Sequence, residues 1–503
     1  MHHVILGAGP AGVTAAETIR KHDAGATITL IGGEPEPPYA RMAIPYYLEG
    51  KILEDGTHLR SDPEHYQSLG INYRQGRAVA LDSKAKQLKL AAPESMEELI
   101  PYDRLLISTG ASPVHPPIKG IQSPGVHTCW TLDDARHIAA LAKKGEPVVL
   151  VGAGFIGSII LEALAKKGVH LTVVETGDRM VPRMLDETAG NMLKSWCENK
   201  GVSVLTGTSV ASIALAETAA ATASTTPTSA SAPPPATAAA RAAPPPEPPA
   251  IPKKIGLLQR LFGYSESSPP PASTAAPAPI TPDPALKPQA MAAEPSTTAA
   301  STGHGLTVTL SNGETLPAAL VVIATGVRPN IEFLTGSGLD IDQGIKVDEH
   351  FATSVPDVYA AGDIAEAKDL STGSFDVLAI QPVAVEHGYL AGLNMAGIPS
   401  THQGSLNMNV LDTIGLISVS FGSWMGVPGG ERANLHDPAE WRYIRLEFSG
   451  DRLIGAQCVG LTQNVGMLRG LIQTGQHLGH WKDVLLRSPE RIAEAYVATT
   501  CGL

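Results

Sequence analysis

Two glycine-rich motifs have the residue types and spacing to bind a phosphorylated ligand. The first is GAGPAG at residues 7–12, after the apolar run 4–6, and the second is GAGFIG at residues 152–157, after the apolar run 148–151. In such a G-x-G-x-x-G motif the first glycine permits a tight turn, the second lets the backbone approach a pyrophosphate, and the third lets a helix pack closely on a sheet. The free N–H groups at the start of the following helix favour phosphate oxygens. Each motif therefore predicts a dinucleotide-binding βαβ unit.

An acidic residue follows each motif at the distance expected of a ribose contact. Glu34 follows the predicted strand 27–31, and Glu175 follows the predicted strand 171–174. A carboxylate about 20 residues beyond the glycines accepts hydrogen bonds from ribose hydroxyls. At Glu175 it would repel the 2′-phosphate of NADPH, which favours NADH, although the nearby Arg179 keeps NADPH as the alternative.

The two predicted units also end in a similar way. The last strand of each, predicted at 105–110 and 321–326, finishes with Thr-Gly. Two dinucleotide sites in one chain imply two dinucleotides that react together. A tightly held flavin and a mobile nicotinamide form such a pair, because one accepts the hydride that the other donates. The repeat therefore predicts FAD and NADH as the cofactors.

With the run VYAAGD at residues 358–363, these motifs resemble the pyridine nucleotide-disulfide oxidoreductase superfamily over essentially the whole chain outside a central insert. The resemblance implies that Asp363 accepts from a ribityl hydroxyl of FAD, or else caps a helix. It also implies a helix that starts at Gln381 and points its positive end at the flavin, although a purely structural cap is the alternative. The residues implied to bind FAD are Gly7, Gly9, Pro10, Ala11, Gly12, Glu34, Arg41, Thr109, Gly110, Gly362, Asp363, Gln381 and Pro382. Those implied to bind NAD are Gly152, Gly154, Phe155, Ile156, Gly157, Glu175 and Gly326.

The segment PPYARMAIPYYL at residues 37–48 departs from the disulfide-reducing branch of that superfamily. Met42 stands where that branch has its redox cysteine, and a thioether forms neither a disulfide nor a thiolate. The segment instead resembles reductases of rubredoxin, nitrite reductase and ferredoxin systems, in which the matching Arg41 would contact the flavin or its phosphates. A surface ion pair is the alternative for Arg41. Ile159 also stands where related reductases usually have Glu, which removes a charge from the expected hydride-transfer zone. No side chain is named as catalytic, because hydride transfer from NADH to a flavin needs no acid or base.

The expected fold is α/β, with two Rossmann-like dinucleotide-binding domains of three layers (ββα) and a C-terminal α+β interface domain. Residues 1–116 and 326–398 are expected to form the FAD domain, 117–325 the NAD domain, and 399–503 the interface domain. The NAD domain is interrupted at 214–302 by a stretch rich in Ala, Pro, Ser and Thr, which predicts a disordered insert. Inside it, residues 252–266 predict either a transient helix or a docking peptide.

Composition argues against several other classes of protein. The formal net charge is -12 without a long basic run, which argues against nucleic acid. No stretch of about 18 apolar residues predicts a membrane span. The four cysteines form no CxxC pair, so no metal site is predicted, and a reducing cytoplasmic setting fits.

The predicted function is that of an FAD-dependent NADH:acceptor oxidoreductase. The favoured acceptor, or donor, is an iron–sulfur protein or a larger redox complex, as in nitrite reductase or phenylglyoxylate-type dehydrogenases. An NADH oxidase or small-molecule reductase is one alternative, and an NADH-responsive redox sensor is another. The resemblance also implies a homodimer built on the C-terminal region.

Overall fold

The computed structural model describes residues 1–91, 98–216 and 305–500. Every element described below belongs to one compact part of the chain, Met1–Ala216 together with Gly303–Leu503. The predicted docking island at 252–266, and all of the predicted insert beyond residue 216, lie outside the described residues.

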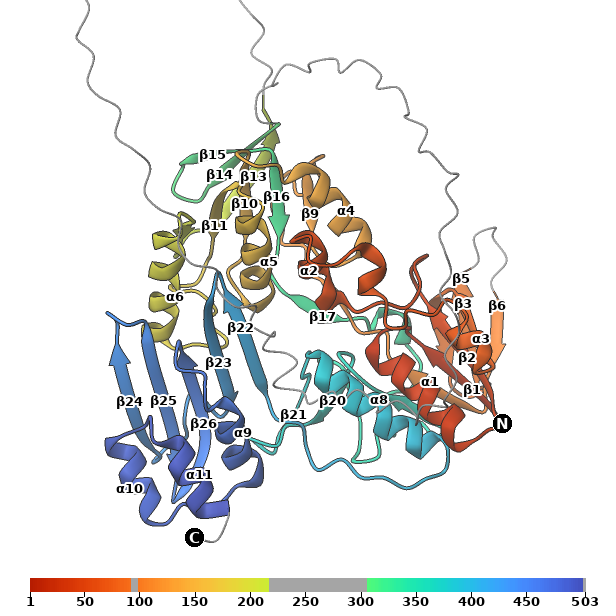
Figure 1. Cartoon of the computed structure of the whole chain (residues 1–503). Helices are drawn as coiled ribbons and strands as arrows, with labels where there is room; N and C mark the ends of the chain where they lie inside the picture. Colours follow the sequence, from red (N-terminus) through yellow and green to blue (C-terminus); the bar gives the residue numbers. More distant parts are fainter. Residues whose placement is uncertain (92–97, 217–304, 501–503) are drawn as a thin grey trace, which may run out of the picture. The chain divides into compact units, whose positions relative to one another are not determined.

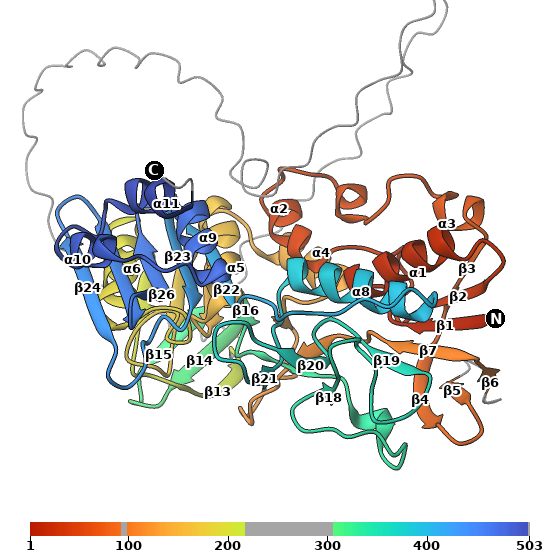
Figure 2. The same ribbon diagram turned by 90° about the horizontal axis from the view of Figure 1, so that it is seen from below.

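The first dinucleotide unit is built on a five-stranded sheet with the order β19-β7-β1-β2-β3 (Figures 1 and 2). All four pairings are parallel. Parallel strands covered on both faces read as continuous apolar runs, which is why these strands were recognisable. This order places the ends of β1, β7 and β19 side by side, although they lie far apart in sequence. The strands are β1 (His2–Leu6), β2 (Thr27–Gly32), β3 (Ile71–Gln75), β7 (Arg104–Ile107) and β19 (Val358–Ala360).

Two helices of this unit, α1 (Pro10–His22) and α8 (Gln381–Met395), pack against each other in close contact (Figure 2). A Cβ added at Gly388 would lie 2.1 Å from the carbonyl oxygen of Ala11, so the two backbones touch there. The start of α8 at Gln381 confirms the predicted helix start. The small antiparallel sheet of this unit consists of β4 (Arg77–Asp82), β5 (Gln87–Ala91) and β6 (Glu98–Pro101).

The second dinucleotide unit repeats the plan with the strand order β12-β11-β10-β16-β9, again all parallel. Alternate residues of β10 face two different layers. Val148 and Leu150 pack with the helices, whereas Val149 and Val151 pack with a small antiparallel sheet on the opposite face. This arrangement confirms three layers for this unit. Its elements are β9 (Val126–Thr128), α4 (Leu132–Leu141), β10 (Pro147–Val151), α5 (Phe155–Lys166), β11 (His170–Val174), α6 (Glu187–Asn199), β12 (Ser203–Leu205) and β16 (Leu320–Ile323).

The antiparallel layer of the second unit brackets the insertion point. β13 (Val210–Leu215) pairs with β14 (Leu306–Leu310), and β14 pairs with β15 (Thr315–Ala318). The predicted insert start at residue 214 is therefore too early, because β13 continues through Leu215 in register with Leu306. Asn312 and Gly313 lie in the hairpin turn between β14 and β15. Gly313 adopts a φ of +88°, and its N–H donates to the carbonyl oxygen of Leu310.

The C-terminal region consists of an antiparallel sheet, with the order β22-β23-β26-β25-β24, and three helices. This confirms the predicted change to an α+β pattern. The last helix starts at Ile492, after a turn at residues 489–491. The elements are β22 (Met408–Thr413), β23 (Leu416–Gly422), β24 (Glu431–Asp437), β25 (Arg442–Ser449), β26 (Arg452–Val459), α9 (Val465–Thr474), α10 (His480–Arg487) and α11 (Ile492–Thr500).

A two-stranded ribbon, β8 (Ala111–Pro113) with β17 (Val327–Pro329), carries the chain between the two dinucleotide units. Shorter elements complete the described chain, and within it no helix has both the length and the apolar character needed to cross a membrane. These are η1 (Arg41–Ala43), α2 (Ile44–Leu48), η2 (Glu54–Thr57), α3 (His65–Ser68), η3 (Glu332–Leu334), β18 (Ile345–Lys346), β20 (Ala365–Lys368) and β21 (Phe375–Asp376).

Candidate functional site

The first glycine motif forms the turn between β1 and α1. Gly7 has a φ of +111°, and a Cβ there would lie 2.1 Å from the carbonyl oxygen of Ser108 in the neighbouring strand end. A Cβ at Gly12 would lie 1.9 Å from the carbonyl oxygen of Gly7. By contrast, a Cβ at Gly9 would meet no atom within 4 Å, so this backbone faces open space at the helix start. Pro10 takes the first turn of α1, where its missing N–H costs nothing.

The second motif reproduces this geometry between β10 and α5. A Cβ at Gly152 would lie 2.5 Å from the carbonyl oxygen of Ala324, and one at Gly157 would lie 2.1 Å from that of Gly152. Gly154 again faces open space. Phe155 and Ile156 open the helix and are only partly buried. Each motif thus has two glycines that packing requires and one, Gly9 or Gly154, whose bare backbone leaves room for a pyrophosphate.

Asp363 lies at the same sheet edge as the first motif, just beyond β19. The N–H of Ala361 donates to the carbonyl oxygen of Ile107, and Gly362 adopts a φ of +76° against the methyl group of Ala11. Burial raises the pKa of Asp363 to about 6, although the charge of Arg41 opposes that rise. Among the described residues no side-chain hydrogen bond reaches this carboxylate. A half-buried carboxylate without a donor fits a ligand hydroxyl, so the residues present fit FAD.

The two Thr-Gly strand ends lie on either side of the β8–β17 ribbon. The side-chain amide of Asn330 donates to the carbonyl oxygen of Thr109 at 2.8 Å, and its backbone N–H donates to that of Gly110 at 3.0 Å. On the other side, the N–H of Val114 donates to the carbonyl oxygen of Gly326 at 2.9 Å. The β8–β17 ribbon therefore connects Thr109 and Gly110, which are predicted to bind FAD, to Gly326, which is predicted to bind NAD.

The start of α8 has the features expected of a site for negative charge. Ile380 occupies the N-cap position without a side-chain hydrogen bond, Pro382 lies in the first turn, and the first turn contains no acidic residue. The free N–H groups there carry partial positive charge. This favours the dipolar role predicted for Gln381 and Pro382 over a purely structural cap.

Glu34 and Arg41, which were expected to contact different parts of FAD, pair with each other. Arg41 donates to Glu34 at 2.5 Å and to the carbonyl oxygen of Trp130 at 2.7 Å, and Tyr39 also donates to Glu34 at 2.6 Å. The Arg41 guanidinium lies 5.2 Å from the centre of the Trp130 ring. Trp130 was not predicted as a site residue, because no local sequence signal marks a partner that lies 89 residues from Arg41 along the chain.

Glu175 is buried, and its carboxylate is held by backbone N–H groups of the second glycine motif and of the turn that follows β11. Its carboxylate accepts from the N–H of Ala153 at 2.6 Å and from the N–H of Gly177 at 2.7 Å. The Thr176 hydroxyl also donates to Oε1 at 3.3 Å, so it is Oε2 that keeps a further lone pair for a ribose hydroxyl. Arg179 pairs with Asp178 at 2.7 Å and donates to the carbonyl oxygen of Leu185 at 3.1 Å. Because this guanidinium already has partners, the geometry favours NADH over NADPH.

The two positions that depart from the disulfide-reducing pattern, Met42 and Ile159, carry no thiol. Met42 lies in η1 and is 46% exposed. Ile159, on α5, packs at the edge of the apolar core of the second unit. Cys129, Cys197 and Cys458 are buried and free, whereas Cys501 lies outside the described residues. Burial raises the pKa of the Cys458 thiol to about 12.

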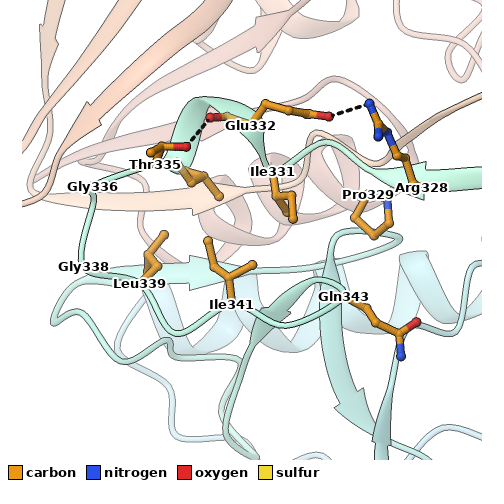
Figure 3. Close-up of a pocket in the computed structure, with 11 residues that line it drawn as sticks. Arg328, Pro329, Ile331, Glu332, Thr335, Gly336, Gly338, Leu339, Ile341 and Gln343 are labelled. Atoms are coloured by element: carbon orange, nitrogen blue, oxygen red, sulfur yellow. Dashed lines mark hydrogen bonds and ion pairs between the residues drawn. The ribbon is translucent and has the colours of Figure 1, made fainter.

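A pocket of about 600 Å³ lies beside the connection between the two units (Figure 3). At its rim Arg328 and Glu332 form an ion pair of 3.2 Å, and apolar side chains such as Ile331 and Ile341 form its walls. None of the predicted dinucleotide residues lines it. The pocket therefore belongs to the surface of β17 and the loop after it, and the glycine turns mark the candidate cofactor sites instead.

Comparison with known proteins agrees with this geometry. The chain is 28% identical over 452 residues to the NADH-dependent phenylglyoxylate dehydrogenase subunit epsilon of Aromatoleum evansii, covering 89% of this chain and 86% of the relative. It is 27% identical over 416 residues to an NADH oxidase of Methanocaldococcus jannaschii, covering 82% of this chain and 73% of the relative.

Solved structures show the same fold. An NAD-dependent persulfide reductase from A. fulgidus has a TM-score of 0.71 at 26% identity, covering 95% of this chain and 78% of the other. The family model described as pyridine nucleotide-disulphide oxidoreductase matches residues 1–232 and 290–388, which is more than half of the chain. The chain therefore belongs to the pyridine nucleotide-disulphide oxidoreductase family and is an oxidoreductase that uses FAD and NADH.

Proposed function

We propose that this chain oxidises NADH and passes the electrons through FAD to a protein acceptor, either an iron–sulfur protein or a larger redox complex. The observation that carries the proposal is the pair of matching glycine turns together with Met42, a thioether where the disulfide-reducing branch of the family has its redox cysteine. When bound, FAD accepts a hydride from NADH and releases electrons one or two at a time. The described cysteines, Cys129, Cys197 and Cys458, are all buried. Within the described residues no exposed thiol is therefore available to relay electrons from the flavin.

The roles proposed for the chain's own residues are binding and orientation. The open backbone at Gly9 admits the FAD pyrophosphate, and Asp363 accepts from a ribityl hydroxyl. The start of α8 offers partial positive charge to the flavin ring. The open backbone at Gly154 admits the NADH pyrophosphate, and Glu175 accepts from its ribose. Hydride transfer between two stacked rings needs no side-chain acid or base, so the chain supplies position rather than a proton.

The acceptor is proposed from the relatives that the chain resembles. Besides the phenylglyoxylate dehydrogenase subunit, they include a rhodocoxin reductase and a probable ferredoxin reductase. The proposal covers electron flow in either direction between FAD and that partner.

A homodimer is also proposed, built on the C-terminal sheet. Met425 is 70% exposed and Val427 is 40% exposed in the loop between β23 and β24, which suits an interface between identical surfaces. Light scattering after size-exclusion chromatography measures the mass, and a stable monomer would contradict this part. A cytoplasmic location is proposed because the described cysteines are reduced.

Anaerobic titration of the purified protein with NADH tests the function directly. Bleaching of the flavin absorbance by one equivalent of NADH is expected, with a weaker response to NADPH. The reduced protein is then mixed with oxidised ferredoxin, rubredoxin and low-molecular-weight acceptors in separate experiments. The Met42→Leu variant, which removes the sulfur at similar size, is the matched control and should behave like the wild type. Rapid turnover with a small molecule, and none with any iron–sulfur protein, would overturn the proposed acceptor.

An NADH oxidase is the second candidate, favoured by the relative from Methanocaldococcus jannaschii. An oxygen electrode separates the two functions. Oxygen uptake as fast as ferredoxin reduction would favour the oxidase. Slow turnover with every acceptor, together with an NADH-dependent change of mass, would favour a redox sensor instead.

A further inference from the structure

Residues 34–57, here called the arm, leave the first dinucleotide unit after β2 and pack into the second. Three of its side chains, Tyr39, Ile44 and Leu48, are buried in the apolar core that contains α4, α5 and one face of the second sheet. The core of the first sheet contains none of the three. Accordingly, α2 lies beside α4 (Figure 1). The arm therefore belongs to the first unit by sequence and to the second by packing.

Arg136 of α4 fixes the arm at two separate points. Its Nε and Nη2 atoms donate to both carboxylate oxygens of Glu54 at 3.0 and 2.6 Å, and its Nη1 atom donates to Glu36 at 2.8 Å. A planar guanidinium suits such paired contacts, which are both strong and directional. The hydrogen bonds from Arg136 lower the pKa of Glu54. One side chain of the second unit thus holds both ends of the arm.

Two further cations cross the same boundary. Lys166 of α5 donates to Glu49 of the arm at 3.0 Å and also pairs with Glu162 on its own helix. In the opposite direction, Arg41 of the arm donates to the carbonyl oxygen of Trp130, just before α4. The arm is therefore held by charge on both sides of α2 as well as by its apolar side chains.

We propose that Arg136 is a positioning residue for hydride transfer, which holds the arm on the NADH-binding unit and so fixes the nicotinamide relative to the flavin. The inference rests on the proposed function, because it assigns Arg136 to that same transfer. The arm carries Arg41, whose charge reaches Asp363 at the FAD edge. Motion of the second unit is consequently transmitted to the flavin side through the arm. A displacement of about 1 Å lowers the rate of a transfer of this kind by 10- to 100-fold.

The exposure of the contact makes it sensitive to salt. The side chain of Arg136 is 39% exposed and that of Glu54 is 38% exposed, whereas that of Glu36 is only 12% exposed. Half-exposed ion pairs are screened as ionic strength rises. Hydride transfer at saturating NADH should therefore slow with added salt in the wild type, and a variant without Arg136 should have lost that dependence.

The test is stopped-flow reduction of the FAD-loaded protein at saturating NADH, from low to high salt. Arg136→Gln is expected to lower the limiting rate about tenfold or more and to abolish its salt dependence, with little change in the Kd for NADH. Arg74→Gln is the matched control, because Arg74 makes an equally bidentate pair with Glu98 inside the first unit. Glu54→Gln removes half of the contact and should give a smaller change in the same direction, should Arg136→Gln fold poorly.

Hydrogen exchange of the FAD-free protein gives a readout that does not depend on activity. Residues 34–57 are expected to exchange faster in Arg136→Gln than in the wild type or in Arg74→Gln. If the flavin is never reduced by NADH although the exchange result holds, the proposed function fails and the arm contact stands. If Arg136→Gln keeps both the wild-type rate and the wild-type protection, or if Arg74→Gln loses as much, the inference is overturned.

Discussion

Gly9 and Gly154 occupy equivalent positions, have extended backbones at the starts of α1 and α5, and face open space. Alanine at either position should therefore fold, while placing a methyl group where a pyrophosphate would approach. We expect Gly9→Ala to purify with less FAD, and Gly154→Ala to keep FAD but bind NADH about tenfold more weakly, or ~1.4 kcal/mol. Flavin absorbance and NADH titration measure the two effects. Gly466→Ala, also in open space, is the control, and loss of the same cofactor from both variants would contradict the assignment.

Glu175 is expected to set the choice of coenzyme, because its Oε2 atom, which accepts from the N–H of Ala153, keeps a lone pair for a ribose hydroxyl. Glu175→Gln keeps the size but removes the charge that repels a 2′-phosphate. The ratio of kcat/KM for NADH to that for NADPH should fall about tenfold, or ~1.4 kcal/mol. Steady-state rates with both coenzymes measure it, with Glu198→Gln on the exposed face of α6 as the control. An unchanged ratio would leave Glu175 with only a structural role.

At the scale of elements, the contact between α1 and α8 links the two parts of the FAD site. Because a Cβ at Gly388 would lie 2.1 Å from the carbonyl oxygen of Ala11, Gly388→Ala must push the two helices apart. Overpacking of this kind costs about 1–3 kcal/mol. We expect a lower melting temperature and weaker FAD retention, measured by calorimetry and flavin release, with Gly466→Ala again as the control. A stable variant that keeps its FAD would show that α8 does not depend on this contact.

The elements that the sequence predicted well are those whose partners are local. Both βαβ units follow from apolar runs and glycines within about 30 residues, and the structure confirms their strands and helices. The arm was placed with the first unit because chain order was the available guide. Its burial in the second unit depends on Leu132 and other residues about 90 positions away, which no local pattern reveals. The ion pair of Arg41 was foreseen as the alternative to a flavin contact, but its partner Glu34 was not, since spacing gives no side-chain direction.

At the scale of the whole molecule, two buried imidazoles link folding to pH. Burial lowers the pKa of His387 to about 3 and that of His3 to about 4, from the ordinary value of 6.5. The Nε2 atom of His387 lies 3.3 Å from the hydroxyl of Ser405, and its Nδ1 atom has no partner among the described residues. Both ring nitrogens of His3 also lack a partner, so in the described part of the chain neither ring has a hydrogen-bonded carboxylate to stabilise its protonated form.

The direction of the pH effect follows from these depressed values. Between about pH 6.5 and pH 4 the unfolded chain binds more protons than the folded chain, so stability that is fully present above pH 6.5 is lost as the pH falls. We expect the melting temperature to decline from pH 7 to pH 4.5 at constant ionic strength, as measured by calorimetry. His387→Gln should flatten that decline, because glutamine does not titrate, whereas His436→Gln on exposed β24 should not. The same slope in the wild type and in His387→Gln would show that protonation of this imidazole does not limit the acid stability of the fold.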